Sequence, residues 1–151
     1  MRALFVLGRA IFGGFFVMNG LNHFKAQDQM TGYASSKGVP APEVAIPSTG
    51  AMLVAGGLSV IAGIKPRQGL ATLIAFLVPV SFQMHRFWEI EDPGQRTSEM
   101  AHFMKNMALA GAALMMMQVD EPWPASVDRA RLAGDEMYVR LGGRDLRGLP
   151  A

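Results

Sequence analysis

Four long apolar runs constrain the fold of this chain more than any other feature of its sequence. They occupy residues 3–24, 46–64, 69–88 and 99–119. Each has about the length that an α-helix needs to cross a lipid bilayer. Half of the residues are hydrophobic and only 17% are charged, whereas soluble domains carry about 25% charged residues. The pattern predicts an all-α integral membrane protein in which four antiparallel spans form a bundle.

The chain is expected to divide into two parts. Residues 1–119 hold the four runs, and residues 120–151 form a polar, arginine-rich tail. A weak helical stripe in the tail predicts a short surface helix. The stripe consists of Val127, Ala130, Gly134, Met137 and Leu141. The end of the tail is expected to be disordered if this helix does not form.

The segments around the second run carry clear local signals. Residues 25–44 contain two glycines and two prolines, so we expect a loop there. Pro47 suits the first turn of the second helix, where a missing N–H leaves no hydrogen bond unmade. Small residues at a spacing of four allow membrane helices to approach closely. The second run has such a ridge, formed by Ala55, Ser59 and Gly63.

Basic residues near the ends of the runs predict the orientation in the membrane. With four spans, Arg2, the turn at residues 65–67 and the tail arginines all lie on one side. Basic residues in short loops mark the cytoplasmic side of a membrane. We therefore expect both termini to be cytoplasmic. Trp88 and Trp123 are expected at the two opposite membrane surfaces, where tryptophan is enriched.

A polar block at residues 83–106 separates the third and fourth runs. The predicted topology places its histidines at the same end of the helices as His23, which ends the first run. Helical spacing pairs His85 with Glu89, and His102 with both Glu99 and Asn106. Arg9 falls on the same stripe as His23. The candidate site thus comprises His23, His85, His102, Asn106, Arg9, Glu89 and Glu99.

These side chains allow several interpretations. Imidazoles, an amide and an arginine can hydrogen-bond quinone carbonyls and pass protons to water. Alternatively, polar side chains collect at a lipid–water interface with no further role. Arg9 could contact an anion, a quinone or an acidic group inside the bundle. We favour an Arg9 that extends toward the headgroups or makes a structural hydrogen bond to a neighbouring helix.

Composition and spacing argue against other classes of function. The chain has no cysteine, which excludes disulfides, thiolate nucleophiles and iron–sulfur sites. The histidines with Glu89 and Glu99 could bind zinc or iron, but they lack the dense spacing of metal-binding motifs, so we predict no metal. A net charge of +2 is too small to indicate a nucleic-acid partner.

Several short motifs carry a resemblance to a known family. They are Gly8-Arg9, the sequence GLNHF at residues 20–24, Gly56-Gly57 and the block HRFWEIEDPGQRTSEMAHFMKNMALAGAALM at residues 85–115. Together, over residues 7–117, they resemble the DoxX family of small four-helix membrane proteins. The resemblance implies a prokaryotic inner-membrane protein. A DoxX-like subunit occurs in an archaeal thiosulfate:quinone oxidoreductase.

The resemblance and the lack of cofactor motifs favour a non-catalytic accessory or anchor subunit of a larger, redox-related membrane complex. The alternative is a quinone-linked oxidoreductase component that uses the histidines. In both cases the expected partners are the lipid bilayer and another membrane protein or further copies of the chain. The accessory role predicts no bound cofactor, and the alternative role takes a quinone.

Overall fold

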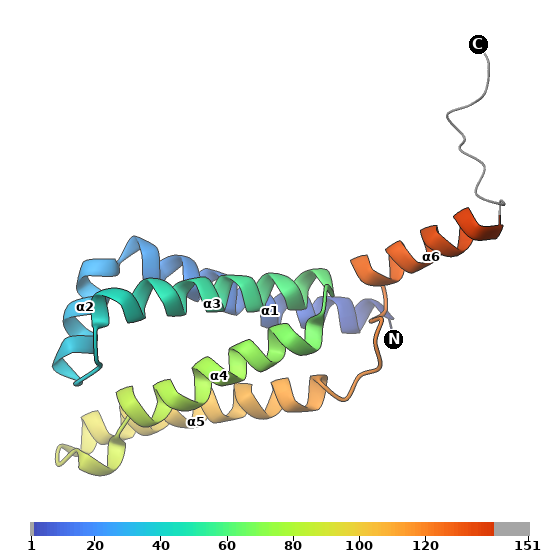
Figure 1. Cartoon of the computed structure of the whole chain (residues 1–151). Helices are drawn as coiled ribbons and strands as arrows, with labels where there is room; N and C mark the ends of the chain where they lie inside the picture. Colours follow the sequence, from blue (N-terminus) through green and yellow to red (C-terminus); the bar gives the residue numbers. More distant parts are fainter. Residues whose placement is uncertain (1, 141–151) are drawn as a thin grey trace.

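The computed structural model describes residues 2–140, and all regular structure in that range is helical. Four long helices run antiparallel, as Figure 1 shows: α1 (Arg2–Lys25), α3 (Pro42–Ala62), α4 (Pro66–Met84) and α5 (Pro93–Met116). Three shorter elements connect or follow them: α2 (Gln27–Ser36), the 3-10 helix η1 (Phe87–Glu89) and α6 (Val127–Arg140). The prediction of an all-α fold is confirmed.

Three segments are long and apolar enough to cross a membrane: Arg2–Lys25, Pro42–Ala62 and Pro66–Glu89. They correspond to the first three predicted spans. Helix α5 is not among them, because its first half carries Arg96, Glu99 and Lys105. Its second half, from Met107 onward, is strongly apolar.

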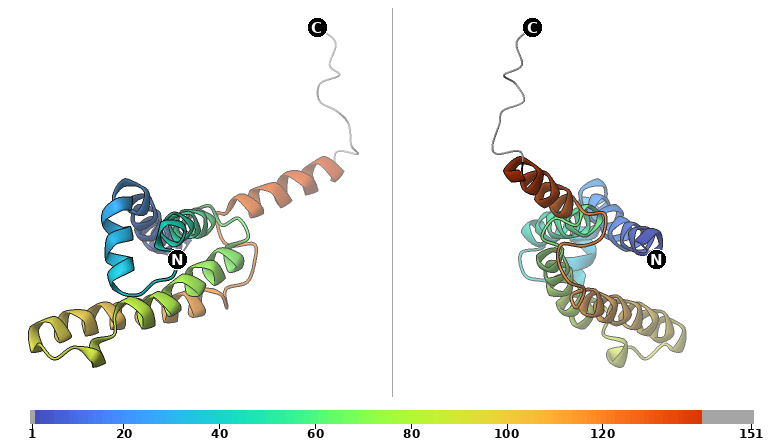
Figure 2. Two further views of the ribbon diagram at one scale, coloured as in Figure 1. Left: turned by 60° about the vertical axis from the view of Figure 1, so that its left-hand side comes forward. Right: turned by 90° about the vertical axis from the view of Figure 1, so that its right-hand side faces the viewer.

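The long helices pack in chain order. Helix α1 packs on α3, α3 on α4 and α4 on α5, whereas α1 and α5 contact each other little. The right-hand view of Figure 2 shows α1 and α3 on one side and α4 and α5 on the other. The arrangement is therefore more open than a closed four-helix bundle, and its open side lies between α1 and α5.

Glycines bring α1 and α3 into close contact. A Cβ atom on Gly13 would lie 2.6 Å from the carbonyl oxygen of Gly57, and one on Gly20 would lie 2.7 Å from that of Gly50. These distances are too short for any side chain, so the two backbones touch directly. Small-residue contacts of this kind are a common way for membrane helices to associate.

The predicted ridge on α3 does not act as one contact line. Ala55 is exposed, whereas Ser59 contacts α4, where a Cβ on Gly69 would lie 2.4 Å from its hydroxyl oxygen. Gly63 ends α3 in the left-handed conformation, with a φ of 66°. Glycine adopts that conformation without strain.

Two helix starts differ from the sequence-based boundaries. Helix α3 begins at Pro42, which makes Pro47 an interior residue rather than a first-turn one. Helix α5 begins at Pro93, because the Asp92 carboxylate accepts a hydrogen bond from the Gln95 N–H at 2.7 Å. Such a cap followed by proline is a strong start signal.

The expectation of a loop at residues 25–44 is wrong for most of the segment, because only residue 26 and residues 37–41 lie outside helices. Residues Gln27–Ser36 form α2, which packs mainly on α3. Gly38, with a φ of 73°, and Pro40 follow it. The glycine and proline signals therefore mark the end of a short helix, and the polar residues before them are helical.

The chain reverses direction at two ends. We call the end with Lys25, Met84 and Pro93 the histidine end, and the other the tail end. The N-terminal start of α1, the α3–α4 turn and the start of α6 all lie at the tail end (Figure 1). This matches the side on which basic residues were predicted to gather.

The segment after α5 folds back onto the tail end. Trp123 is fully buried, and its ring meets that of Phe5 edge-on at 5.2 Å between centroids. The Asp128 carboxylate accepts a hydrogen bond from the Lys65 N–H at 2.9 Å, at the start of α4. Trp123 thus lies at the opposite end from Trp88, and its ring packs within the protein rather than against lipid.

Helix α6 confirms the predicted helix in the tail. It runs away from the long helices (Figures 1 and 2), and its side chains from Arg129 to Met137 are all exposed. Leu141 and the residues after it, where disorder was considered, lie outside the described residues.

Candidate functional site

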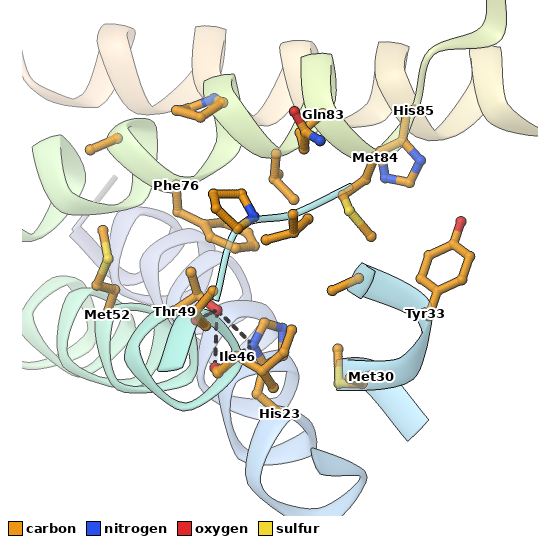
Figure 3. Close-up of a pocket in the computed structure, with 17 residues that line it drawn as sticks. His23, Met30, Tyr33, Ile46, Thr49, Met52, Phe76, Gln83, Met84 and His85 are labelled. Atoms are coloured by element: carbon orange, nitrogen blue, oxygen red, sulfur yellow. Dashed lines mark hydrogen bonds between the residues drawn. The ribbon is translucent and has the colours of Figure 1, made fainter. Parts of the chain in front are cut away.

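A cavity of about 510 Å³ lies at the histidine end, between α2, α3 and α4. Figure 3 shows the side chains that surround it. Most of its walls are apolar, and they include Met30, Ile46, Met52, Phe76 and Met84. Its polar groups are His23, Tyr33, Thr49, Gln83 and His85. A cavity of this size and composition fits a small, mostly apolar molecule that carries a few polar atoms.

The end of α1 contributes His23, whose ring is held by α3. Its Nδ1 lies 3.2 Å from the Ile46 carbonyl oxygen and 3.1 Å from the Thr49 hydroxyl. The Thr49 hydroxyl donates to the Ala45 carbonyl at 2.7 Å. Since a carbonyl only accepts, the network assigns the Nδ1 of His23 as the donor. In the neutral ring, Nε2 is then a free acceptor.

His85 follows the last turn of α4 and is held in a similar way. Its Nδ1 lies 2.7 Å from a carboxylate oxygen of Glu99 on α5. An ionised carboxylate only accepts, so Nδ1 again carries the proton. In the described part of the chain, Nε2 of His23 and Nε2 of His85 have no hydrogen-bond partner. Both histidines line the same cavity.

Glu99 connects three elements around the cavity. Besides His85, it contacts the Lys37 ammonium at 3.6 Å and accepts a long hydrogen bond, 3.5 Å, from the Tyr33 hydroxyl. The Lys37 carbonyl accepts hydrogen bonds from Gln83, at 2.9 Å, and from Arg86. The end of α2 is thereby tied to α4 and α5 across the mouth of the cavity.

The pairing of His85 with Glu89 that spacing predicted does not form. Helix α4 ends at Met84, and His85 has a non-helical backbone with a φ of −117°. Consequently Glu89 pairs with Arg86, at 3.3 Å, rather than with His85. The structure instead joins His85 to Glu99, which lies 14 residues further along the chain.

The other predicted residues lie nearby but outside this cavity. His102 is exposed and stacks on His85, with ring centroids 5.2 Å apart. Asn106 is buried and lines a second, smaller cavity between α1, α4 and α5. The structure therefore gathers the three histidines at one end of the helices, but only two of them face the main cavity.

Arg9 belongs to the opposite end of the molecule. It is 5% exposed, and its Nη2 donates a hydrogen bond to the Ala125 carbonyl in the tail segment. It reaches neither the histidines nor the solvent. Its hydrogen bond is structural, as one interpretation expected, but the partner is the tail segment and not a neighbouring helix. Its Nε and Nη1 are buried without a hydrogen-bond partner in the described residues.

No three histidine, aspartate or glutamate side chains within residues 2–137 converge as metal ligands do. The rings of His85 and His102 are stacked at 19°. A metal ion lies in the plane of each imidazole that binds it, and two stacked rings lie in different planes. His85 and His102 in this arrangement do not have the geometry of a pair of metal ligands.

Sequence reasoning missed three polar residues of the site. Tyr33 and Lys37 were assigned to a loop, although an aromatic hydroxyl and a cation between two spans were a usable signal. Thr49 received no role in the predicted site, whereas its hydroxyl orients His23. Gln83 belonged to the predicted polar block and does line the cavity.

Comparison with known proteins addresses the family of the chain. The family model described as DoxX matches residues 4–86, more than half of the 151 residues. The match includes α1 to α4, His23 and His85, and ends before η1 and α5. Comparison with curated proteins and with solved structures gives no match. On the strength of the family model, the chain belongs to the DoxX family.

Proposed function

We propose that the protein is the quinone-binding membrane subunit of a larger redox complex. The observation that supports this most directly is the cavity of about 510 Å³ with two imidazoles in its wall. Each imidazole is anchored through Nδ1 and presents an unpaired Nε2. Two fixed acceptors beside apolar walls suit a flat, apolar ring that carries hydroxyl or carbonyl oxygens.

The donors and acceptors match both forms of such a ligand. A hydroquinone donates two O–H groups, and a neutral Nε2 accepts one. A quinone accepts instead, and the hydroxyl of Tyr33 or a protonated His85 can donate. His85 is the better route for a proton, because its Nδ1 is hydrogen-bonded to the Glu99 carboxylate at 2.7 Å. Lys37 lies next to Glu99 and continues the path of the proton toward the solvent.

Electrons require a second protein in this proposal. The chain has no cysteine, and so no thiolate that could hold an iron–sulfur cluster. We assign the chain to binding the ligand and handling its protons, and we assign electron transfer to a partner subunit. The proposal thereby retains the larger complex that the sequence favours.

Binding of a short-chain ubiquinone analogue to the detergent-purified protein tests the assignment. His23→Ala and His85→Ala each remove one acceptor, which should raise Kd about tenfold. His102→Phe is the matched control, because it keeps an aromatic ring stacked on His85 and does not line the main cavity. It should change Kd less than about threefold. Unchanged binding in both cavity variants, or an equal loss in His102→Phe, would rule out this site.

We also propose a fourth membrane span, in addition to the three segments that are long and apolar enough to cross a membrane. In our proposal α5 is the fourth span, residues 1–119 form the membrane domain, and both termini are in the cytoplasm of a prokaryotic cell. The support is the shared tail end of the N-terminus, the basic α3–α4 turn and α6. A reporter fused after Ala151 should be active only in the cytoplasm, whereas periplasmic activity would invert this topology.

A purely structural anchor is the second candidate. The observation in its favour is α6, whose side chains from Arg129 to Met137 are all exposed. Native mass analysis after gentle extraction should show a larger assembly in both cases. Quinone-analogue binding by the isolated 16.3 kDa chain then separates them, since an anchor alone does not bind it.

A further inference from the structure

A second cavity opens on the side where α1 and α5 do not pack against each other. Its volume is about 120 Å³, and its polar lining includes Asn19 from α1 and both Lys105 and Asn106 from α5. His23, His85 and Phe76 form part of its wall and also line the larger cavity. The two cavities therefore lie on opposite sides of one wall.

Asn106 is the residue that points to a ligand here. It is only 6% exposed, and its amide makes no hydrogen bond within the described residues. In the described chain, three side-chain polar atoms are both fully enclosed by protein and without a hydrogen-bond partner, and none of them belongs to Asn106. The polar atoms of Asn106 are therefore accessible. A buried amide without a partner is destabilising, so its free groups facing this cavity indicate a polar occupant.

The charge of the cavity decides which occupant it suits. The Lys105 ammonium lies 5.9 Å from the centre of the Phe15 ring, which lines the cavity. No carboxylate is among the lining residues that the structure describes. Glu99, which lies close in sequence, is engaged by His85 and Lys37. The cavity thus combines one cation and amide donors with no acidic group.

The apolar part of the lining strengthens the attraction between these groups and an anion. Phe16, Leu53 and Leu77 are almost fully buried and form apolar walls. Charge interactions are stronger beside such walls than in water. Asn19 donates one amide hydrogen to the Phe15 carbonyl at 2.7 Å and retains its second. It can therefore donate, together with Asn106, to one acceptor.

We propose that this cavity binds a small monovalent anion, such as chloride, nitrate or formate. The Lys105 ammonium supplies the charge, and the amide N–H groups of Asn106 and Asn19 donate the directed hydrogen bonds. The volume of about 120 Å³ admits an anion of a few heavy atoms and excludes larger organic anions. This site is independent of quinone binding, although the bound anion would lie beside both histidines.

Anion-dependent thermal stability of the full chain tests the proposal. The protein is purified in phospholipid-free detergent with gluconate as the only anion, and nitrate is titrated in at constant ionic strength. A ligand that binds the folded state raises Tm in a saturable way. Lys105→Met and Asn106→Leu should each raise the half-saturating nitrate concentration about tenfold or more.

Lys25→Met is the matched control. It removes the same charge from the histidine end of α1, at an exposed residue outside the cavity lining. It should leave the nitrate response unchanged. The proposal fails if Tm rises without saturation, if Lys105→Met responds like the wild type, or if Lys25→Met loses the response equally. If Asn106→Leu does not fold in gluconate, the exposed Lys105→Met decides alone.

Discussion

Two neighbouring glycines in α1 provide the sharpest test of how the helices pack. Gly13 faces α3, and a Cβ there would lie 2.6 Å from both the Gly57 carbonyl oxygen and Cγ1 of Ile61. A Cβ on Gly14 would meet nothing within 4 Å. We predict that Gly13→Ala destabilises the protein and that Gly14→Ala does not.

The magnitude follows from the geometry. Ordinary contact begins at 3.4 Å, so α1 and α3 must separate by 3.4 − 2.6, or about 0.8 Å. Overpacking of this kind costs about 1–3 kcal/mol. Both substitutions gain the same helix propensity, about 1 kcal/mol. That gain cancels between the variants, so their free energies of unfolding should differ by about 1–3 kcal/mol.

The assay is reversible unfolding in mild detergent by added sodium dodecyl sulfate, followed by circular dichroism. Gly13→Ala should unfold at a lower mole fraction of dodecyl sulfate than the wild type, and Gly14→Ala at an equal or higher one. If the two variants agree within about 0.5 kcal/mol, α1 and α3 do not touch at Gly13, and the close contact described above is incorrect.

Three further predictions concern the polar contacts and the tail. Glu99→Ala should lower the free energy of unfolding by about 3 kcal/mol, because it breaks a buried pair, whereas Glu89→Ala should cost under about 1 kcal/mol at its exposed pair; chemical unfolding measures both. Trp123→Ala should cost about 3–5 kcal/mol in the same assay, while Trp123→Phe should cost under about 1.5 kcal/mol, because the indole N–H has no partner in the described residues. Thr49→Val removes the hydroxyl that orients His23 and should weaken quinone-analogue binding about fivefold without loss of fold. An equal Kd for Thr49→Val and wild type would show that the ring is held by the Ile46 carbonyl alone.

The long helices could be predicted because their signal is hydrophobic length, which depends on composition alone. Helix α2 could not, because its Gly32 and polar residues look like a loop until Ala34 is seen to pack against other elements. Ala34 is 1% exposed, so tertiary contacts stabilise a segment with little helical signal of its own. Most helical stability in proteins arises in this way.

The gathering of the histidines at one end followed from topology, since alternate connections of antiparallel helices lie together. Their partners did not, because spacing rules hold only while a helix continues. Helix α4 stops one residue before His85, and this turns the ring toward Glu99 on α5 rather than toward Glu89. Neither the stop nor the resulting pair could be read from the spacing of the residues.

The contact between Arg9 and Ala125 joins residues that are 116 positions apart. The segment that covers Arg9 is made only after all four long helices, because it follows α5 in the chain. A chain cut before Trp123 therefore leaves the guanidinium of α1 without its hydrogen-bond partner.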